Sequence, residues 1–96
     1  MILATVVGSV VSTIKDEGLH GSKLLLVRAC TPEQEAHGEP YVAVDTVGAG
    51  EGELVLVARG SAARETNRTG GAPVDAAIIA IVDSLDVEGN VTFRKS

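Results

Sequence analysis

Aromatic residues are nearly absent from this chain of 96 residues, because Tyr41 and Phe93 are the only two. The hydrophobic interior must therefore be built from Val, Leu, Ile and Ala, and the β-branched members of that set favour strands. The scarcity of aromatic rings also argues against a surface on which the bases of single-stranded nucleic acid would stack.

Positive charge is scarce as well. The chain has 8 Lys and Arg residues against 13 Asp and Glu, which gives a formal net charge of −5. Because proteins bind nucleic acids and anionic membranes largely through Lys and Arg, this balance disfavours both partners. The N-terminal segment has no basic start and reaches Lys15 and Asp16 too soon for a membrane span or a signal peptide.

The residues that usually carry chemistry are few and scattered. The single cysteine, Cys30, has no partner for an intrachain disulfide and lies in an apolar segment, as a small buried hydrophobe would. His20 and His37 lie in separate glycine-containing loops without a second ligand at metal-binding spacing. Ser61 lacks the G-x-S-x-G pattern of a nucleophile elbow. We therefore predict no enzymatic activity, no metal, no cofactor and a cytoplasmic location.

Five segments have the composition of strands and are separated by turn signals. The first is long and is interrupted at Gly8, where a bulge is expected. A short helix with Ser61 as its N-cap is expected after the fourth. The expected strands are 2–14, 23–30, 41–45, 53–59 and 76–85, and the expected helix is 61–67. This pattern predicts one mainly β domain over residues 1–96, a small closed or partly open five-stranded barrel with one short helix.

Three of these strands do not alternate between apolar and polar residues. Segments 24–27, 54–58 and 76–82 are apolar at every position, so both faces of each strand are apolar. Leaving four such side chains in water would forgo roughly 6 to 12 kcal/mol of burial. A small barrel has one interior, and the second face must be covered by the helix, the C-terminal segment or another subunit. A subunit interface is the simplest of these three.

The stretch GAGEG at 48–52 directly precedes the fourth strand. A phosphate-binding glycine loop has a helix N-terminus after its glycines and usually a nearby Lys. Here a strand follows instead, and the neighbouring side chains are Asp45, Glu51 and Glu53. We interpret the glycines as sites of positive φ or close backbone approach, either in the chain's own turn or between copies of the chain.

Three segments together resemble the bacterial microcompartment vertex proteins of the EutN/CcmL family, over nearly the whole chain. They are GSVVSTIKDEGLHGSKLLLV, VAVDTVGAGEGELVLVARGSAAR and PVDAAIIAIVD. The middle one is the most specific, because it keeps the family's order at Asp45, Val47, Gly48, Ala49, Gly50, Gly52, Glu53, Gly60, Ser61, Ala62 and Arg64. Segments 31–40 and 65–72 carry no recognisable part of the pattern.

The resemblance implies an OB-like barrel assembled as a homopentameric ring. Such rings cap the fivefold vertices of a microcompartment shell in the cytoplasm, beside hexameric shell proteins. We hypothesise that the fivefold axis or the subunit interface involves Gly48, Ala49, Gly50, Glu51, Gly52, Glu53, Ser61 and Arg64.

Two further segments have expected roles in this assembly. Loop 31–40 is expected to contact neighbouring hexamers. Segment 86–96, in which Gly89 and Asn90 either turn a short hairpin or end an arm, is expected to contact a neighbouring subunit. The alternative function is an OB-fold binding module for single-stranded nucleic acid or another small ligand, which would be a monomer or a dimer.

Overall fold

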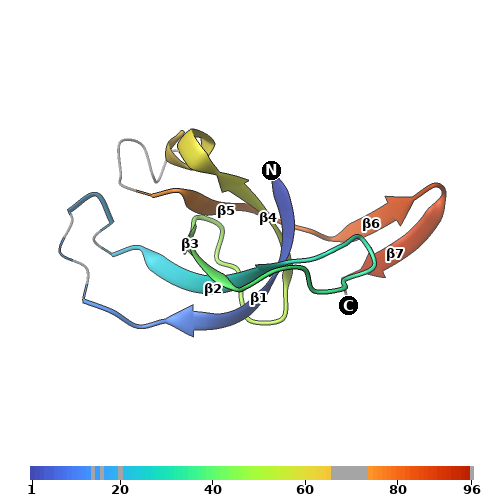
Figure 1. Ribbon diagram of the computed structural model, residues 1–96, viewed down its shortest axis with the longest axis horizontal. Coiled ribbons are helices and arrows are strands. Elements are labelled where there is room, and N and C mark those ends of the chain that lie inside the picture. The colour runs from blue at the N-terminus through green and yellow to red at the C-terminus, as the bar shows by residue number, and fades with distance from the viewer. Residues whose placement is uncertain (14, 16, 20, 66–73, 96) are drawn as a thin grey trace.

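The computed structural model describes residues 1–96 except 14, 16, 20, 66–73 and 96 (Figure 1). Five strands close into a barrel in the order β1-β2-β3-β5-β4. Neighbouring strands pair antiparallel, except that β3 and β5 pair parallel. The strands are β1 (Ile2–Val10), β2 (Lys23–Ala29), β3 (Tyr41–Asp45), β4 (Leu54–Arg59) and β5 (Ala76–Ile81). The predicted five-stranded barrel is confirmed.

The barrel interior is built from small and β-branched side chains, as the lack of aromatic residues requires. Alternate residues of each strand point inward, and the buried core consists of Ala4, Val6, Leu25, Val27, Ala43, Ala49, Val55, Val57, Ala76 and Ile78. In β1, Val6 pairs with Val27 and Gly8 with Leu26, so Val7 is an extra residue on one strand. This is the bulge that Gly8 predicted.

Four predicted strand ends differ from the structure: the end of the second strand at 30 and the start of the fourth at 53 are each wrong by one residue, and the ends at 14 and 85 are wrong by more. β1 stops at Val10, which pairs with Leu24. Leu24 is only the second residue of β2, which begins at Lys23. Residues after Val10 therefore have almost no opposite strand left to pair with. The last apolar run is divided into β5, which ends at Ile81, and a new strand that begins at Ser84.

The predicted helix is a single 3-10 turn, η2 (Gly60–Arg64). Its N-cap is Arg59, which makes no side-chain capping hydrogen bond, so the prediction that Ser61 is the N-cap is wrong. Gly60 has a φ of 63° and donates its N–H to the Asp75 carbonyl at 2.8 Å. The chain thus turns directly at the end of β4, and the N-cap position falls two residues before Ser61. Residues 66 and 67 of the expected helix lie outside the described residues. One more short 3-10 turn, η1 (Glu17–Leu19), lies between β1 and β2.

A separate antiparallel hairpin, β6 (Ser84–Val87) and β7 (Asn90–Arg94), projects from one end of the barrel (Figure 1). Glu88 and Gly89 join the two strands with φ values of 52° and 86°, the pair of positive values that a type I′ turn requires. The projection contributes to an elongated shape of 44 × 24 × 24 Å. β6 and β7 pack mainly on each other. The C-terminal segment is therefore a projecting hairpin, one of the two forms left open by its sequence. The expected turn pair of Gly89 and Asn90 is wrong by one residue, because Asn90 already pairs with Val87 in β7.

Part of the outer barrel surface is covered by the chain itself. Ala63 of η2 and Val74 pack with Val44 and Ala77, which face outward from β3 and β5. The helical turn therefore buries part of the apolar outer surface that the non-alternating strands were expected to have. It does not extend over the whole outer surface.

Candidate functional site

The glycine loop, residues 46–53, joins β3 to β4 and is fixed by hydrogen bonds within the chain. Asp45 Oδ1 accepts the N–H groups of Val47 at 3.0 Å and Gly48 at 3.1 Å. Gly52 donates its N–H to the Val6 carbonyl of β1 at 2.8 Å. The loop is an ordered turn fastened to the barrel by carboxylate and backbone acceptors.

The three glycines of the loop occupy different backbone conformations. Gly48 and Gly52 have φ values of 78° and 89°, in the region that favours glycine. Gly50 has no positive φ, and a Cβ built there would approach only Glu53 Oε1, at 3.4 Å. The chain's own conformation therefore requires glycine at 48 and 52 but not at 50.

Ala49 points away from the loop surface into the barrel core, where it is fully buried. Its carbonyl accepts a hydrogen bond from Lys23 Nζ at 2.9 Å, and Lys23 also lies 3.8 Å from Asp45 Oδ2. The side chain of Ala49 thus contributes to the fold of its own subunit.

Replacing Ala49 by Leu is expected to lower the free energy of unfolding by about 1–3 kcal/mol, because extra methylene groups overpack a filled core. Urea denaturation followed by circular dichroism measures this change. The exposed Glu51→Leu variant adds a similar side chain two residues away, on the loop surface. Equal stability of the two variants would contradict the inward orientation of Ala49.

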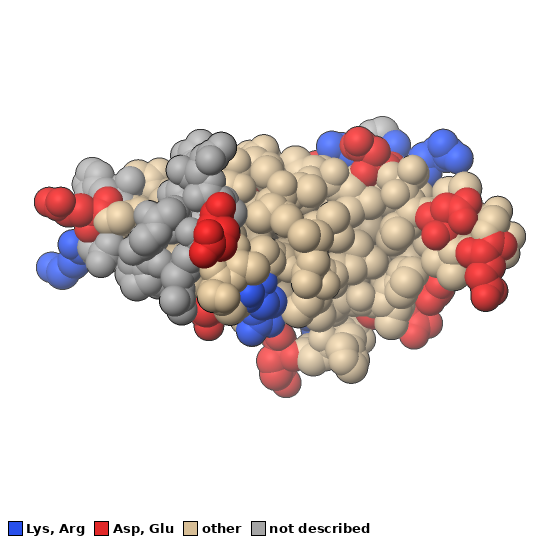
Figure 2. Space-filling model, turned by 90° about the horizontal axis from the view of Figure 1, so that it is seen from above, with Lys and Arg blue, Asp and Glu red and all other residues tan. Residues whose placement is uncertain are grey.

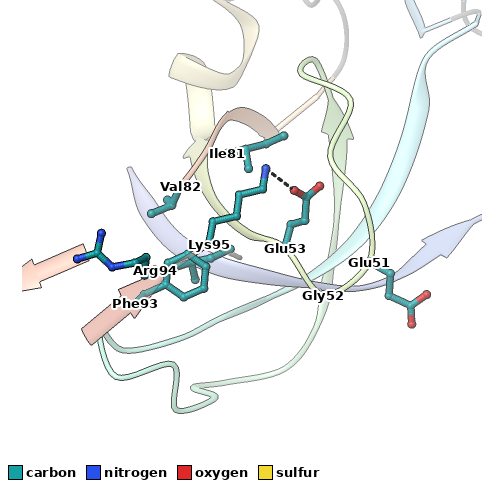
Figure 3. Close-up of a pocket in the computed structure, with 9 residues that line it drawn as sticks. Glu51, Gly52, Glu53, Ile81, Val82, Phe93, Arg94 and Lys95 are labelled. Carbon is teal, nitrogen blue, oxygen red and sulfur yellow. Dashed lines mark ion pairs between the residues drawn. The ribbon is translucent and has the colours of Figure 1, made fainter. Parts of the chain in front are cut away.

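Glu53 connects the glycine loop to the base of the C-terminal hairpin. Its Oε2 lies 3.0 Å from Lys95 Nζ (Figure 3), and its Oε1 accepts the Gly50 N–H at 2.6 Å. The Lys95 N–H donates to the Asp83 carbonyl at 2.8 Å, which closes the hairpin. The hydrogen bond from Lys95, followed by that from Gly50, holds the pKa of Glu53 below its ordinary value.

Between this ion pair and the hairpin lies a groove of about 320 Å³. Figure 3 shows the Phe93 ring beside it, with Arg94 directed away and Glu51 pointing outward from the loop. The apolar part of its lining is Leu54, Ile81, Val82 and Phe93. Because Phe93 and Lys95 both belong to the C-terminal segment, this segment covers the end of the barrel at its base.

The Glu53→Gln variant is expected to be less stable than the unchanged chain near neutral pH and equally stable in acid. The folded-state pKa of Glu53 is lowered from 4.5, so the ionised carboxylate stabilises the fold above that pH. The contribution is lost as the pH falls through the lowered pKa. Urea unfolding of both proteins at pH 7 and at successively lower pH tests this, and a difference that persists undiminished in acid would contradict it.

The hypothesised interface residues form two groups that the structure keeps apart. Residues 48–53 precede β4, whereas Ser61 and Arg64 belong to η2, which follows β4. Six strand residues at a rise of about 3.3 Å separate the groups by roughly 20 Å. Ser61 is exposed, and the side chain of Arg64 lies outside what the structure describes. The two groups cannot form one continuous site within a subunit.

Two rows of outward-facing apolar residues were not identified from the sequence. The first, called here the β4 row, consists of Leu3, Leu56 and Ala80, which are paired across β1, β4 and β5. The second, called the β2 row, consists of Gly8, Leu26 and Val42, which are paired across β1, β2 and β3. Val42 is 45% exposed, and the other members are half-buried. Segments 24–27 and 54–58 do not alternate between apolar and polar residues, and this pattern was the sequence feature that indicated the two rows.

Figure 2 shows the side of the molecule that carries η2 and β5 at the top of Figure 1. Charged side chains lie at both ends of this side and also near its middle, and an area without Lys, Arg, Asp or Glu lies right of centre between them. An uncharged area bordered by charged side chains resembles the arrangement of a protein interface, whose core is depleted of charge and whose rim is polar.

The described residues offer little for other functions. None of them form a group of three or more His, Cys, Asp or Glu side chains that could hold a metal ion. Within the same residues, no helix is long and apolar enough to cross a membrane. Tyr41 packs against the core and lies beneath Arg59, whose guanidinium carbon is 4.3 Å from the ring centre. With Phe93 in the groove, neither aromatic ring provides an open platform for nucleic acid bases.

Comparison with known proteins gives consistent results over the length of the chain. The family model described as ethanolamine utilisation protein EutN/carboxysome matches residues 1–83. The bacterial microcompartment shell vertex protein EutN of Escherichia coli is 42% identical over 95 residues, which cover 99% of this chain and 100% of that protein. The carboxysome shell vertex protein CcmL of Synechococcus elongatus is 45% identical over 95 residues, covering 99% and 96%.

Solved structures agree with these sequence relatives. CcmL of Nostoc sp. superposes with a TM-score of 0.91 at 46% identity, covering 99% of this chain and 100% of that one. The pentameric microcompartment shell protein GrpN from Rhodospirillum rubrum superposes with a TM-score of 0.81 at 46% identity, covering 91% and 99%. The family model ends at residue 83, directly before β6, so the hairpin lies beyond it.

Proposed function

The chain belongs to the EutN/CcmL family of microcompartment shell vertex proteins, and we propose that five copies of it form the ring that closes a fivefold corner of such a shell. The observation that carries this proposal is the near full-length similarity to a pentameric shell protein at 46% identity. The chain is a structural protein of the shell in the cytoplasm and not an enzyme. The alternative of a nucleic-acid-binding module has no support from these relatives.

The mechanism of such a protein is geometric. A layer of hexagonally packed units stays flat, and a unit with fivefold symmetry introduces curvature where it replaces one of them. We propose that hexameric shell proteins surround the ring and that loop 31–40 contacts them. Residues 32–40 are exposed over their whole length, which supports this assignment.

The glycine loop is proposed to lie near the fivefold axis or the adjacent subunit boundary. Gly50 supports this placement because the fold of the single chain does not require a glycine there. A position without a side chain allows close approach of another backbone. In a ring, the segments nearest the axis approach their own symmetry copies.

The Gly50→Leu variant is expected to fold normally and to form at least tenfold less pentamer, because the new side chain occupies the space of the neighbouring subunit. Native mass spectrometry measures the fraction of rings. Glu35→Leu, in the exposed loop 31–40, is the control and is expected to leave the pentamer intact. Undiminished pentamer in Gly50→Leu would count against the placement of the loop.

The projecting hairpin is proposed to lie against a neighbouring subunit. A two-stranded hairpin is at best marginally stable alone in water. Its tip nevertheless carries Val87 and Val91, and Val91 is 52% exposed. A neighbouring subunit in the ring would cover these side chains.

The proposed function is tested by native mass spectrometry of the full chain in solution. The expected species has five times the subunit mass of 9.8 kDa. A well-folded single chain at high concentration would overturn the proposal. Co-expression with hexameric shell proteins then tests the vertex role, with closed polyhedral shells expected only when the ring is present.

A further inference from the structure

We propose that the β4 row of one subunit packs against the β2 row of the next, so that the ring is assembled head to tail through two different apolar faces. This inference rests on the proposed function, since it assigns the surfaces through which the five copies meet. Both rows point outward from the closed barrel and lie on different strands. Neither contains a charged side chain.

The need for two faces follows from the symmetry of a ring. A self-complementary patch joins two copies and leaves nothing for a third, whereas a ring of five requires each subunit to offer two distinct surfaces. The chain has two outward apolar rows, one centred on Leu56 of β4 and one on Leu26 of β2. A second copy is therefore the occupant that the symmetry requires.

The shapes of the two rows also differ. Val42 of the β2 row borders a hollow of about 190 Å³, whose lining also includes Leu24, Val44 and Val74. Leu56 is the large side chain at the centre of the β4 row. We assign Leu56 as the residue that meets the β2 row beside this hollow.

The available surface is sufficient for two contacts of this kind. A standard interface buries about 800 Å² on each partner, so two faces would use about 1,600 Å². The single subunit exposes 5790 Å². Enough surface remains for contacts with other shell proteins. Burial of two uncharged rows also avoids the cost of desolvating an ion pair.

The test uses one charged substitution on each face of the full chain. Val42→Glu blocks the β2 row and Leu56→Glu blocks the β4 row, and each variant alone is expected to remain a single subunit. Val11→Glu is the matched control, because Val11 is 98% exposed and belongs to neither row. It is expected to form the same pentamer as the unchanged chain.

Mixing the two blocked variants gives the decisive measurement. Each has one intact face that fits the intact face of the other, so native mass spectrometry should show a one-to-one heterodimer and nothing larger. Ala80→Glu replaces Leu56→Glu if circular dichroism shows that the latter does not fold. Pentamers of either blocked variant, or a mixture without heterodimer, would overturn the face assignment while the proposed function stands. A single-subunit wild-type chain would overturn both.

Discussion

Deletion of residues 84–96 is expected to convert the pentamer into single subunits. The deletion removes both strands of the projecting hairpin, together with Phe93 and the ion pair between Lys95 and Glu53. Burial of the two tip valines against a neighbour would contribute about 1.5–3 kcal/mol each when complete. Because the loss recurs at every junction of the ring, the effect on assembly is much larger than the effect on one contact.

A second variant separates lost assembly from damage to the barrel. The deletion also uncovers Leu54 and Ile81 at the groove, which lowers the stability of the subunit itself. The double variant Val87→Ser and Val91→Ser alters only the tip and keeps Phe93 and Lys95 in place. It is expected to unfold like the wild type and to form at least tenfold less pentamer. Analytical ultracentrifugation measures both variants, and intact rings in both would show that the hairpin does not join subunits.

The parts of the fold that the sequence predicted are those governed by local signals. β3 spans Tyr41–Asp45 as expected, because Pro40 precedes it and the glycine loop follows it. The bulge at Gly8 was likewise predictable from a single glycine inside an apolar strand. Glycine requirements at 48 and 52 agree with the expectation of positive φ in the loop.

The parts that the sequence could not predict depend on pairing between distant segments. The end of β1 is set by where β2 begins, and the cap of η2 is displaced by the hydrogen bond from Gly60 to Asp75. The pairing of Leu3 with Leu56 and of Leu56 with Ala80 follows from strand register. Register is a property of the closed barrel, so the two outer rows were not recognisable as rows beforehand.

The hypothesised site illustrates the same limit. Ala49 was grouped with the surface glycines, yet its side chain lies in the core. Ser61 and Arg64 lie at the other end of β4 from the loop within one subunit, and their placement at an interface between subunits stays a prediction. The ion pair from Glu53 to Lys95 joins two segments that are far apart in the chain. The sequence identifies these segments, but it does not show in which direction their side chains point.

Replacement of residues 32–39 by a Gly/Ser loop of equal length is expected to leave pentamers intact and to prevent normal shell closure. All of these side chains are exposed, so the barrel core is unchanged. The native loop is nevertheless ordered, since Arg28 Nε donates to the Gly38 carbonyl at 2.8 Å and Cys30 forms a bridge with Ala36. An ordered, exposed loop loses little conformational entropy when it binds a partner.

The charge of this loop provides a finer variant of the same experiment. Its three glutamates, Glu33, Glu35 and Glu39, are all exposed, and they would favour a positively charged surface on the protein that the loop contacts. Their replacement by Gln keeps the loop length and is expected to give shells whose closure is impaired less than by the full graft. Electron microscopy of shells co-expressed with hexameric proteins should show open or elongated particles for the graft. Closed shells of normal shape, formed with the grafted pentamer incorporated, would refute the contact, because the ring would then meet its neighbours through other surfaces.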